Sequence, residues 1–138
     1  MRRERYLKKL EVFEEELNFI ESHRICDDVT ERALLHSLQV CVEVSMDVVA
    51  MLMRDMGLVA EDDYTNIEKL TRETVMDKEE CETLKDYNGL RDAVVHRYNH
   101  LDMKYVEEGL AGIDKLYSIV AKLAVVYERL EGVEAIDD

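Results

Sequence analysis

Proline and tryptophan are both absent from this sequence, and only five glycines occur in its 138 residues. β-Rich domains need many tight turns, and tight turns recruit proline and glycine for their backbone angles. This scarcity argues against a turn-rich β protein and predicts a few long helices joined by short connections. A chain of this length suits one compact domain and is too short for two.

Cysteines and long apolar runs are also scarce. The three cysteines, Cys26, Cys41 and Cys81, are odd in number and none has CxxC spacing, which favours reduced thiols over a disulfide framework. The longest apolar run, VVAMLM at residues 48–53, is far too short to span a bilayer, and no N-terminal segment resembles a signal peptide. We therefore expect a soluble, cytoplasmic protein.

Positive charge is in short supply: 18 Lys and Arg face 32 Asp and Glu, for a net charge of -14. Such a chain repels RNA and DNA at long range, so a nucleic-acid function needs a local basic patch or a basic partner. The N-terminal stretch MRRERYLKKL is one such patch. A solvated helix start explains the same residues more simply.

Apolar residues recur at spacings of three and four along five segments, as in amphipathic helices. The predicted helices cover residues 3–24, 28–56, 62–76, 77–95 and 102–131. Asp28 and Glu31, and again Asp77 and Glu80, have the spacing of a capping box. The chain is therefore predicted to be an all-α, up-and-down bundle of about five helices, with one domain over residues 1–131 and an acidic tail over 132–138.

The second predicted helix carries two apolar stripes instead of one. The first is Ala33, Ser37, Val40, Val44, Val48 and Met51, and the second is Leu35, Leu38, Val42, Ser45, Val49 and Leu52. One buried face suffices for a peripheral helix, so this helix is predicted to be central or to face a partner as well. We expect a homodimer.

The stretch GLRDAVVHRYNHLD, residues 89–102, concentrates groups that could do chemistry. A guanidinium such as Arg91 matches the oxygens of a phosphate, and a histidine such as His96 can accept and donate a proton near neutral pH. These are the parts for metal-independent RNA cleavage: the histidine takes the proton of a ribose 2′-hydroxyl, and the arginine stabilises the charge on the phosphorane oxygens. Asp92 could orient either residue.

Helical spacing complicates this interpretation. Arg91 and His96 lie about 140° apart around an ideal helix, so they would not share a face. Either the helix unwinds near His96, or the site draws residues from two protomers. The spacing leaves both alternatives open.

The order Arg91, Asp92, His96, Tyr98 resembles the Arg-x4-His-x-Tyr motif of the HEPN superfamily, in particular the HepT-like toxins. That superfamily fills the position of Asp92 with Asn, Asp or His, most often Asn. The segment ERALLHSLQVCVEVSMDVVAMLM from Glu31 and the segment LDMKYVEEGL after the motif also fit the family's layout, and the resemblance covers roughly residues 1–127.

This resemblance implies a HEPN bundle that forms a homodimer, with the motif residues of both chains lining a cleft. It implies a metal-independent endoribonuclease toxin whose partner is a minimal nucleotidyltransferase antitoxin. Arg91 and His96 would be the catalytic pair, Asp92 would support them, and Tyr98 would be the tyrosine that the partner modifies with AMP. No cofactor or metal is expected.

Two other interpretations remain open. Asp92, His96 and His100 stand at i, i+4 and i+8 and could hold a divalent cation if the helix continued through Asn99. A non-catalytic HEPN module, which binds a nucleotidyltransferase partner or a nucleotide without cutting RNA, would suit the strong negative charge. His23 and His36 are expected to be surface histidines.

Overall fold

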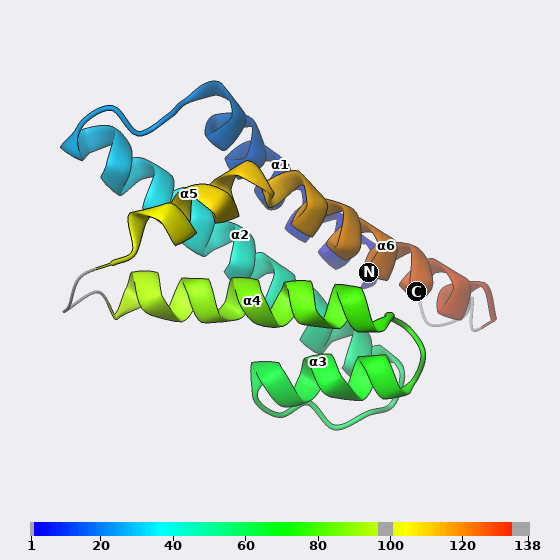
Figure 1. Cartoon of the computed structure of the whole chain (residues 1–138). Coiled ribbons are helices and arrows are strands. Elements are labelled where there is room, and N and C mark those ends of the chain that lie inside the picture. The colour runs from blue at the N-terminus through cyan, green and yellow to red at the C-terminus, as the bar shows by residue number, and fades with distance from the viewer. Residues whose placement is uncertain (1, 97–100, 134–138) are drawn as a thin grey trace.

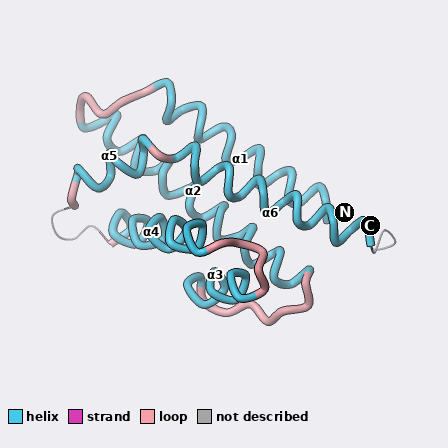
Figure 2. The backbone as a smooth tube through the Cα atoms, turned by 45° about the vertical axis from the view of Figure 1, so that its right-hand side comes forward, coloured by secondary structure: helices cyan, strands magenta, loops and turns pink. Residues whose placement is uncertain are grey.

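The computed structural model describes residues 2–96 and 101–133, and within these ranges it contains six helices and no strand (Figures 1 and 2). The helices are α1 (Arg2–Ser22), α2 (Asp28–Asp55), α3 (Asp63–Arg72), α4 (Lys78–Val95), α5 (Met103–Ala111) and α6 (Ile113–Val133). The predicted all-α bundle is confirmed. The two described ends of the chain lie at one end of the bundle, and the C-terminal end of α4 lies at the other (Figure 1).

Helix α2 is the centre of the bundle, because it packs against all five other helices. Both of its apolar stripes are used in this way, and its buried residues include Leu35, Leu38, Val42, Val48 and Leu52. Packing within the chain thus buries most of both stripes and leaves Ala33, Val40 and Met51 partly exposed, while the homodimer stays a prediction. α2 is also long and apolar enough by composition to cross a membrane, but burial among the other helices explains that composition.

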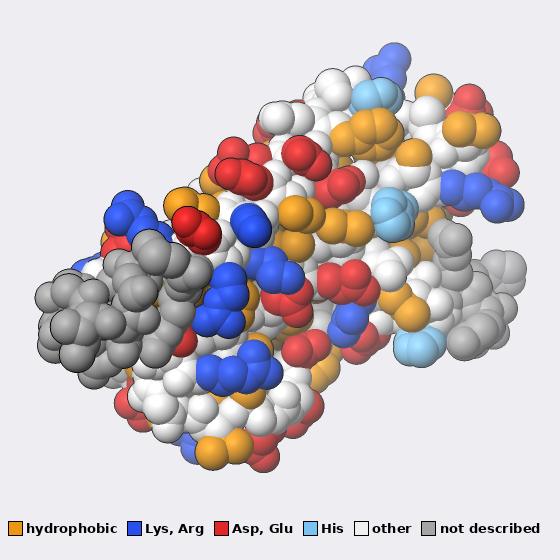
Figure 3. Space-filling model, turned by 180° about the vertical axis from the view of Figure 1, so that it is seen from behind, with side chains coloured by type: hydrophobic (Ala, Val, Ile, Leu, Met, Phe, Trp, Pro, Cys, Tyr) orange, Lys and Arg blue, Asp and Glu red, His pale blue; other side chains and the backbone are white. Residues whose placement is uncertain are grey.

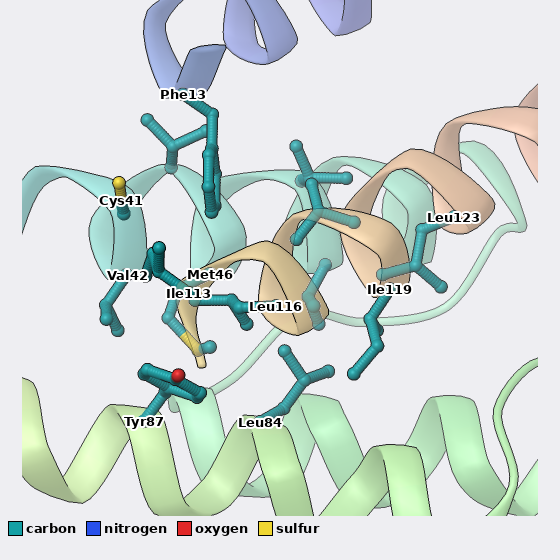
Figure 4. Packing of buried hydrophobic residues seen from close by; sticks show 14 of the residues in the cluster. Phe13, Cys41, Val42, Met46, Leu84, Tyr87, Ile113, Leu116, Ile119 and Leu123 are labelled. Atoms are coloured by element: carbon teal, nitrogen blue, oxygen red, sulfur yellow. The ribbon is translucent and has the colours of Figure 1, made fainter. Parts of the chain in front are cut away.

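The core lies where α1, α2, α4 and α6 meet. Figure 4 shows Phe13 of α1 at the top and Leu84 and Tyr87 of α4 at the bottom, with Val42 of α2 and Leu116 of α6 between them. Phe13 and Tyr117 meet edge to face with centroids 5.2 Å apart, and Tyr6 stacks on Tyr127 at 4.3 Å. These aromatic pairs join α1 to α6, while the buried side chains of Leu84 and Tyr87 hold α4, which carries the motif, against the core.

Local signals set most helix ends. α4 begins at the predicted capping box, in which Asp77 accepts from the Glu80 amide at 2.8 Å and Glu80 accepts from the Asp77 amide at 3.0 Å. The box predicted for α2 was one residue too late: Asp27 is the N-cap, and the Thr30 hydroxyl takes the reciprocal role. α3 ends at Arg72, short of the predicted residue 76, because Thr74 adopts a left-handed φ of 59°.

The last predicted helix is two helices, because the chain breaks at Gly112. The Gly109 carbonyl, which a continuous helix would use to bind the amide of residue 113, accepts a hydrogen bond from Tyr87 Oη at 2.7 Å. A Cβ at Gly112 would stand 3.1 Å from the same hydroxyl. Glycine weakens the helix at this point and lets α5 approach α4 closely.

Two glycines give a matched test of this packing. A Cβ on Gly109 would overlap Leu90 Cδ2 in the core, so Gly109→Ala should lower the free energy of unfolding by about 1–3 kcal/mol. A Cβ on Gly89, in α4, would meet only Tyr64 Oη at an ordinary 3.6 Å, so Gly89→Ala should raise it by roughly 0.5–1 kcal/mol. Urea unfolding followed by circular dichroism measures both. A stabilised Gly109→Ala protein would contradict the close approach.

Candidate active site

The motif residues lie in the last turn of α4 and just after it. The helix is rotated so that Tyr87, Leu90 and Val94 point into the core. This rotation turns Arg91 towards α2 and α3 and leaves it half-buried. Val95 is exposed at the end of the helix.

Arg91 lies within a nest of acceptors from three helices. Its Nη2 is 3.1 Å from the Asp92 carboxylate, 3.3 Å from the Asn88 side-chain oxygen and 3.4 Å from the Asp63 carboxylate, and its Nη1 is 3.8 Å from the Glu43 carboxylate. Its Nε is buried and has no hydrogen-bond partner among the described residues. Glu43 comes from α2 and Asp63 from the first turn of α3, so the guanidinium joins three elements.

None of these contacts has the length of a strong charged hydrogen bond, which is about 2.7–2.9 Å. Partly exposed ion pairs of this kind contribute only about 0–1 kcal/mol each. The guanidinium is therefore held in position without being saturated. A phosphate oxygen could replace one of the carboxylates at little cost in free energy.

The nest carries more negative charge than one guanidinium can neutralise. Burial raises the pKa of the Asp63 carboxyl, Arg91 beside it acts in the opposite direction, and the nearby carboxylates of Asp92, Asp47 and Asp62 raise it further. The net result is a pKa above the ordinary value of 3.8. An anion can therefore reach Arg91 more easily from a side that lacks these carboxylates.

His96 is the C-cap of α4 and is exposed. Its backbone amide still donates to the Asp92 carbonyl at 3.0 Å, but its φ and ψ of −103° and 40° depart from helical values. Helix α4 thus ends at Val95, with His96 as its C-cap. This agrees with the first alternative, in which the helix unwinds near His96. Asp92 joins the two motif residues through different atoms, its carboxylate contacting Arg91 and its carbonyl binding the His96 amide.

Tyr98 and His100 lie outside the described residues, so the proposed modification site and the Asp92–His96–His100 cation site remain predictions. Among the residues that the structure does describe, no group of three His, Cys, Asp or Glu side chains could hold a metal ion. The N-terminal basic patch is at the far end of the bundle from the end of α4 (Figure 1). Two of its members are paired with carboxylates, Arg3 with Glu128 and Lys9 with Asp47.

Sequence reasoning missed three neighbours of Arg91. Asn88 precedes Arg91 by three residues on the same helix, so helical spacing alone could have identified it. Glu43 and Asp63 belong to other helices, and only the packing of α2 and α3 against α4 brings them near.

The chain resembles known proteins over nearly its whole length. A family model described as ribonuclease HepT-like matches residues 3–123. A protein of Archaeoglobus fulgidus named "Putative RNase" is 51% identical over 132 residues, which cover 96% of this chain and 100% of that protein. A second protein of that name from the same organism is 38% identical, with 97% of this chain and 99% of that protein covered.

Two solved structures have a similar fold at low sequence identity. One, from a complex described as the toxin–antitoxin pair MntA–HpeT, has a TM-score of 0.77 and 16% identity and covers 87% of this chain and 98% of its own. The other, from a complex of a tri-AMPylated Shewanella oneidensis HEPN toxin with an MNT antitoxin, has a TM-score of 0.72 and 16% identity, with 90% and 96% covered. At this identity the likeness supports the fold.

Two adjacent carboxylates near Arg91 should respond to pH with opposite signs. A raised pKa means that folded Asp63 holds its proton more tightly than the unfolded chain does, so wild-type stability falls as pH rises above 3.8 through the folded value. Asp63→Asn removes this loss. Its free energy of unfolding should match wild type in acid and exceed it at neutral pH.

Asp62, the N-cap of α3, supplies the control. Hydrogen bonds from Thr65 lower its pKa, so its ionised form stabilises the fold above 3.8 and this contribution is lost as pH falls through the lowered value. Asp62→Asn should therefore be less stable than wild type at neutral pH. Urea titrations at a series of pH values measure both variants, and an Asp63→Asn protein destabilised at neutral pH would show that the Arg91 pair outweighs burial.

Proposed function

The chain belongs to the ribonuclease HepT-like family, and we propose that it is a metal-independent endoribonuclease that acts as the toxin of a toxin–antitoxin pair. The proposal rests on the position of the motif. Arg91 is fixed by nearby carboxylates but its Nε has no hydrogen-bond partner among the described residues, and the exposed His96 follows at the end of the same helix. The name shared by the Archaeoglobus fulgidus relatives supports the same activity.

In the proposed reaction His96 accepts the proton of a ribose 2′-hydroxyl, and the 2′-oxygen attacks the adjacent phosphorus. The bond from phosphorus to the 5′-oxygen breaks, which leaves a 2′,3′-cyclic phosphate and a 5′-hydroxyl that takes up a proton. Arg91 stabilises the negative charge on the phosphorane oxygens. Positioned proton transfer raises the reaction rate by about 10²–10⁴. The proposed mechanism therefore uses His96 for proton transfer and Arg91 for charge stabilisation.

Asp92 acts as a positioning residue in this scheme, because its carboxylate is the acceptor nearest to the Arg91 guanidinium. Its negative charge also opposes an incoming phosphate. The phosphate therefore exchanges with the more distant carboxylates of Glu43 or Asp63 while Asp92 keeps its contact.

The partner that we propose is a minimal nucleotidyltransferase antitoxin, which transfers AMP from ATP to the Tyr98 hydroxyl and releases pyrophosphate. Both structural neighbours come from complexes with such antitoxins, and one of those toxins is described as tri-AMPylated. We propose in addition that the active form is a homodimer whose cleft is lined by Arg91 and His96 of both chains. This arrangement would bring together two groups that one helix separates by about 140°.

A non-catalytic module that binds a nucleotidyltransferase or a nucleotide is the second candidate function. The three carboxylates around Arg91 favour it, because they oppose RNA in a chain of net charge -14. Incubation with total RNA separates the candidates. Cleavage that survives a chelator supports the nuclease, cleavage that a chelator abolishes indicates a metal site, and absence of cleavage leaves the binding module.

His96→Ala should abolish RNA cleavage and growth toxicity while helical content stays unchanged, because the exposed imidazole supplies proton transfer but little packing. Gel analysis of RNA fragments and circular dichroism measure the two effects. His23→Ala removes another exposed histidine far from the motif in sequence and should leave cleavage intact. Persistent cleavage by the His96→Ala protein would remove this residue from the mechanism.

Co-expression with a neighbouring nucleotidyltransferase should add the mass of one or more AMP groups to the protein, and the first should fall on Tyr98. Intact-mass spectrometry and a peptide map locate the modification. Tyr98→Phe should prevent it, whereas Tyr105→Phe should not, because the Tyr105 hydroxyl already donates to the Asp86 carbonyl at 3.0 Å. AMP found only on other residues would contradict the assignment.

A further inference from the structure

A second feature lies beside the motif and is not part of it. A cavity of about 220 Å³ opens between the first half of α2 and the last turn of α4, lined by Arg32, Leu35, His36, Gln39, Val94 and Val95. Val95 directly precedes His96, so the cavity borders the candidate catalytic histidine. We name these six residues the α2–α4 cavity.

The lining combines apolar walls with groups that favour an anion. Leu35, Val94 and Val95 supply the walls, while Arg32 and His36 are exposed at the rim. Arg32 contacts Asp28 at 3.2 Å through a pair in which both side chains are about three-quarters exposed. Such surface pairs are weak, so a phosphate could displace Asp28 from Arg32. Figure 3 shows histidine side chains next to hydrophobic surface on the face opposite to that of Figure 1.

A polar connection links the cavity to Arg91. Gln39 Nε2 donates to Glu43 Oε2 at 3.1 Å, and the same oxygen is 3.8 Å from Arg91 Nη1. Arg32, His36, Gln39 and Glu43 stand at spacings of four, three and four on α2, so they form one continuous line along the helix. The cavity and the nest around Arg91 are therefore two ends of one surface.

Charge differs between these two ends. Arg91 meets carboxylates from three helices: Glu43 of α2, Asp63 of α3 and Asp92 of α4. On the side of the cavity, the rim carries Arg32 and His36 and ends next to His96. A phosphate next to Arg91 meets these three carboxylates, whereas a phosphate at the cavity rim meets Arg32 and His36.

We propose that the α2–α4 cavity is a subsite for one nucleotide of single-stranded RNA, the nucleotide next to the phosphate that is cleaved. The base packs against the exposed Val95, over a floor formed by the buried Leu35 and Val94, and Arg32 and His36 bind the backbone phosphate. Pockets for whole small-molecule ligands occupy about 300–1,000 Å³. A cavity of about 220 Å³ is smaller, so it suits one base, with the sugar and phosphate at the rim. The inference rests on the proposed function, since it places the substrate of that reaction.

The test uses a fluorescein-labelled, fully 2′-O-methylated single-stranded RNA, which lacks the attacking hydroxyl and is not cleaved. Fluorescence anisotropy gives its dissociation constant at several salt concentrations. Arg32→Gln with His36→Gln should weaken binding on the order of tenfold and reduce the salt slope by roughly 0.7 for each lost phosphate contact. On unmodified RNA the same double variant should raise KM while kcat changes little.

The chain offers a charge-matched control. His23 and Arg24 are also an exposed histidine and arginine, but they line a different cavity, with Ile20 of α1 and Leu110 of α5. His23→Gln with Arg24→Gln removes the same charges and should leave RNA affinity close to that of wild type. Equal losses in the two double variants, or no loss in either, would overturn the subsite.

Two further outcomes separate the subsite from the proposed function. Cleavage by wild type whose KM is unaffected by Arg32→Gln with His36→Gln refutes the subsite and leaves the nuclease standing. Cavity-dependent binding of the methylated RNA without cleavage of unmodified RNA refutes the nuclease and leaves the subsite standing. Light scattering is the last check: a double variant that binds RNA weakly only because its subunits dissociate would assign the cavity to an interface between copies and overturn the subsite.

Discussion

Burial of α2 is the constraint on which the rest of the structure depends. Its two apolar stripes pack mostly against the five other helices, and a polar line along the helix stays accessible. That line contains Arg32, His36, Gln39, Glu43 and Asp47. Because α4 packs along the same helix, the polar line supplies both the cationic rim of the α2–α4 cavity and one carboxylate of the Arg91 nest. One helix thus makes the core and one wall of the candidate site.

Much of this arrangement could be predicted from local patterns, because they depend on neighbours in sequence. The capping box of Asp77 and Glu80 placed the start of α4 correctly, and the motif was placed at that helix's far end. Errors arose where a distant group decides the outcome. The break at Gly112 depends on Tyr87, which belongs to another helix, and the Arg91 nest depends on Glu43 and Asp63. The double stripe of α2 predicted a helix that is central or also faces a partner. The central position is confirmed, and the homodimer stays a prediction.

The electrostatics of Arg91 explain how an acidic protein could still act on RNA. A free guanidinium on a surface of net charge -14 would attract carboxylates or counterions in any geometry. Here the chain supplies those carboxylates itself, at distances of 3.1 to 3.8 Å that fix the orientation of the group without forming short charged hydrogen bonds. In the proposed reaction, the charge needed in the transition state is thereby oriented in advance, and the weak contacts would be exchanged for a phosphate.

Asp92 contacts both Arg91 and His96 from a single position in the helix. Its carboxylate holds Arg91 on the half-buried side of α4, while its carbonyl holds the amide of His96 where the helix ends and the imidazole meets solvent. Only the first of these contacts uses the side chain. An amide at this position could accept the same hydrogen bond from Arg91 without adding a negative charge. If the protein cleaves RNA as proposed, the Asp92 carboxylate holds the guanidinium more firmly but lowers the affinity for RNA. In the proposed subsite, Arg32 and His36 at the cavity rim would offset that loss.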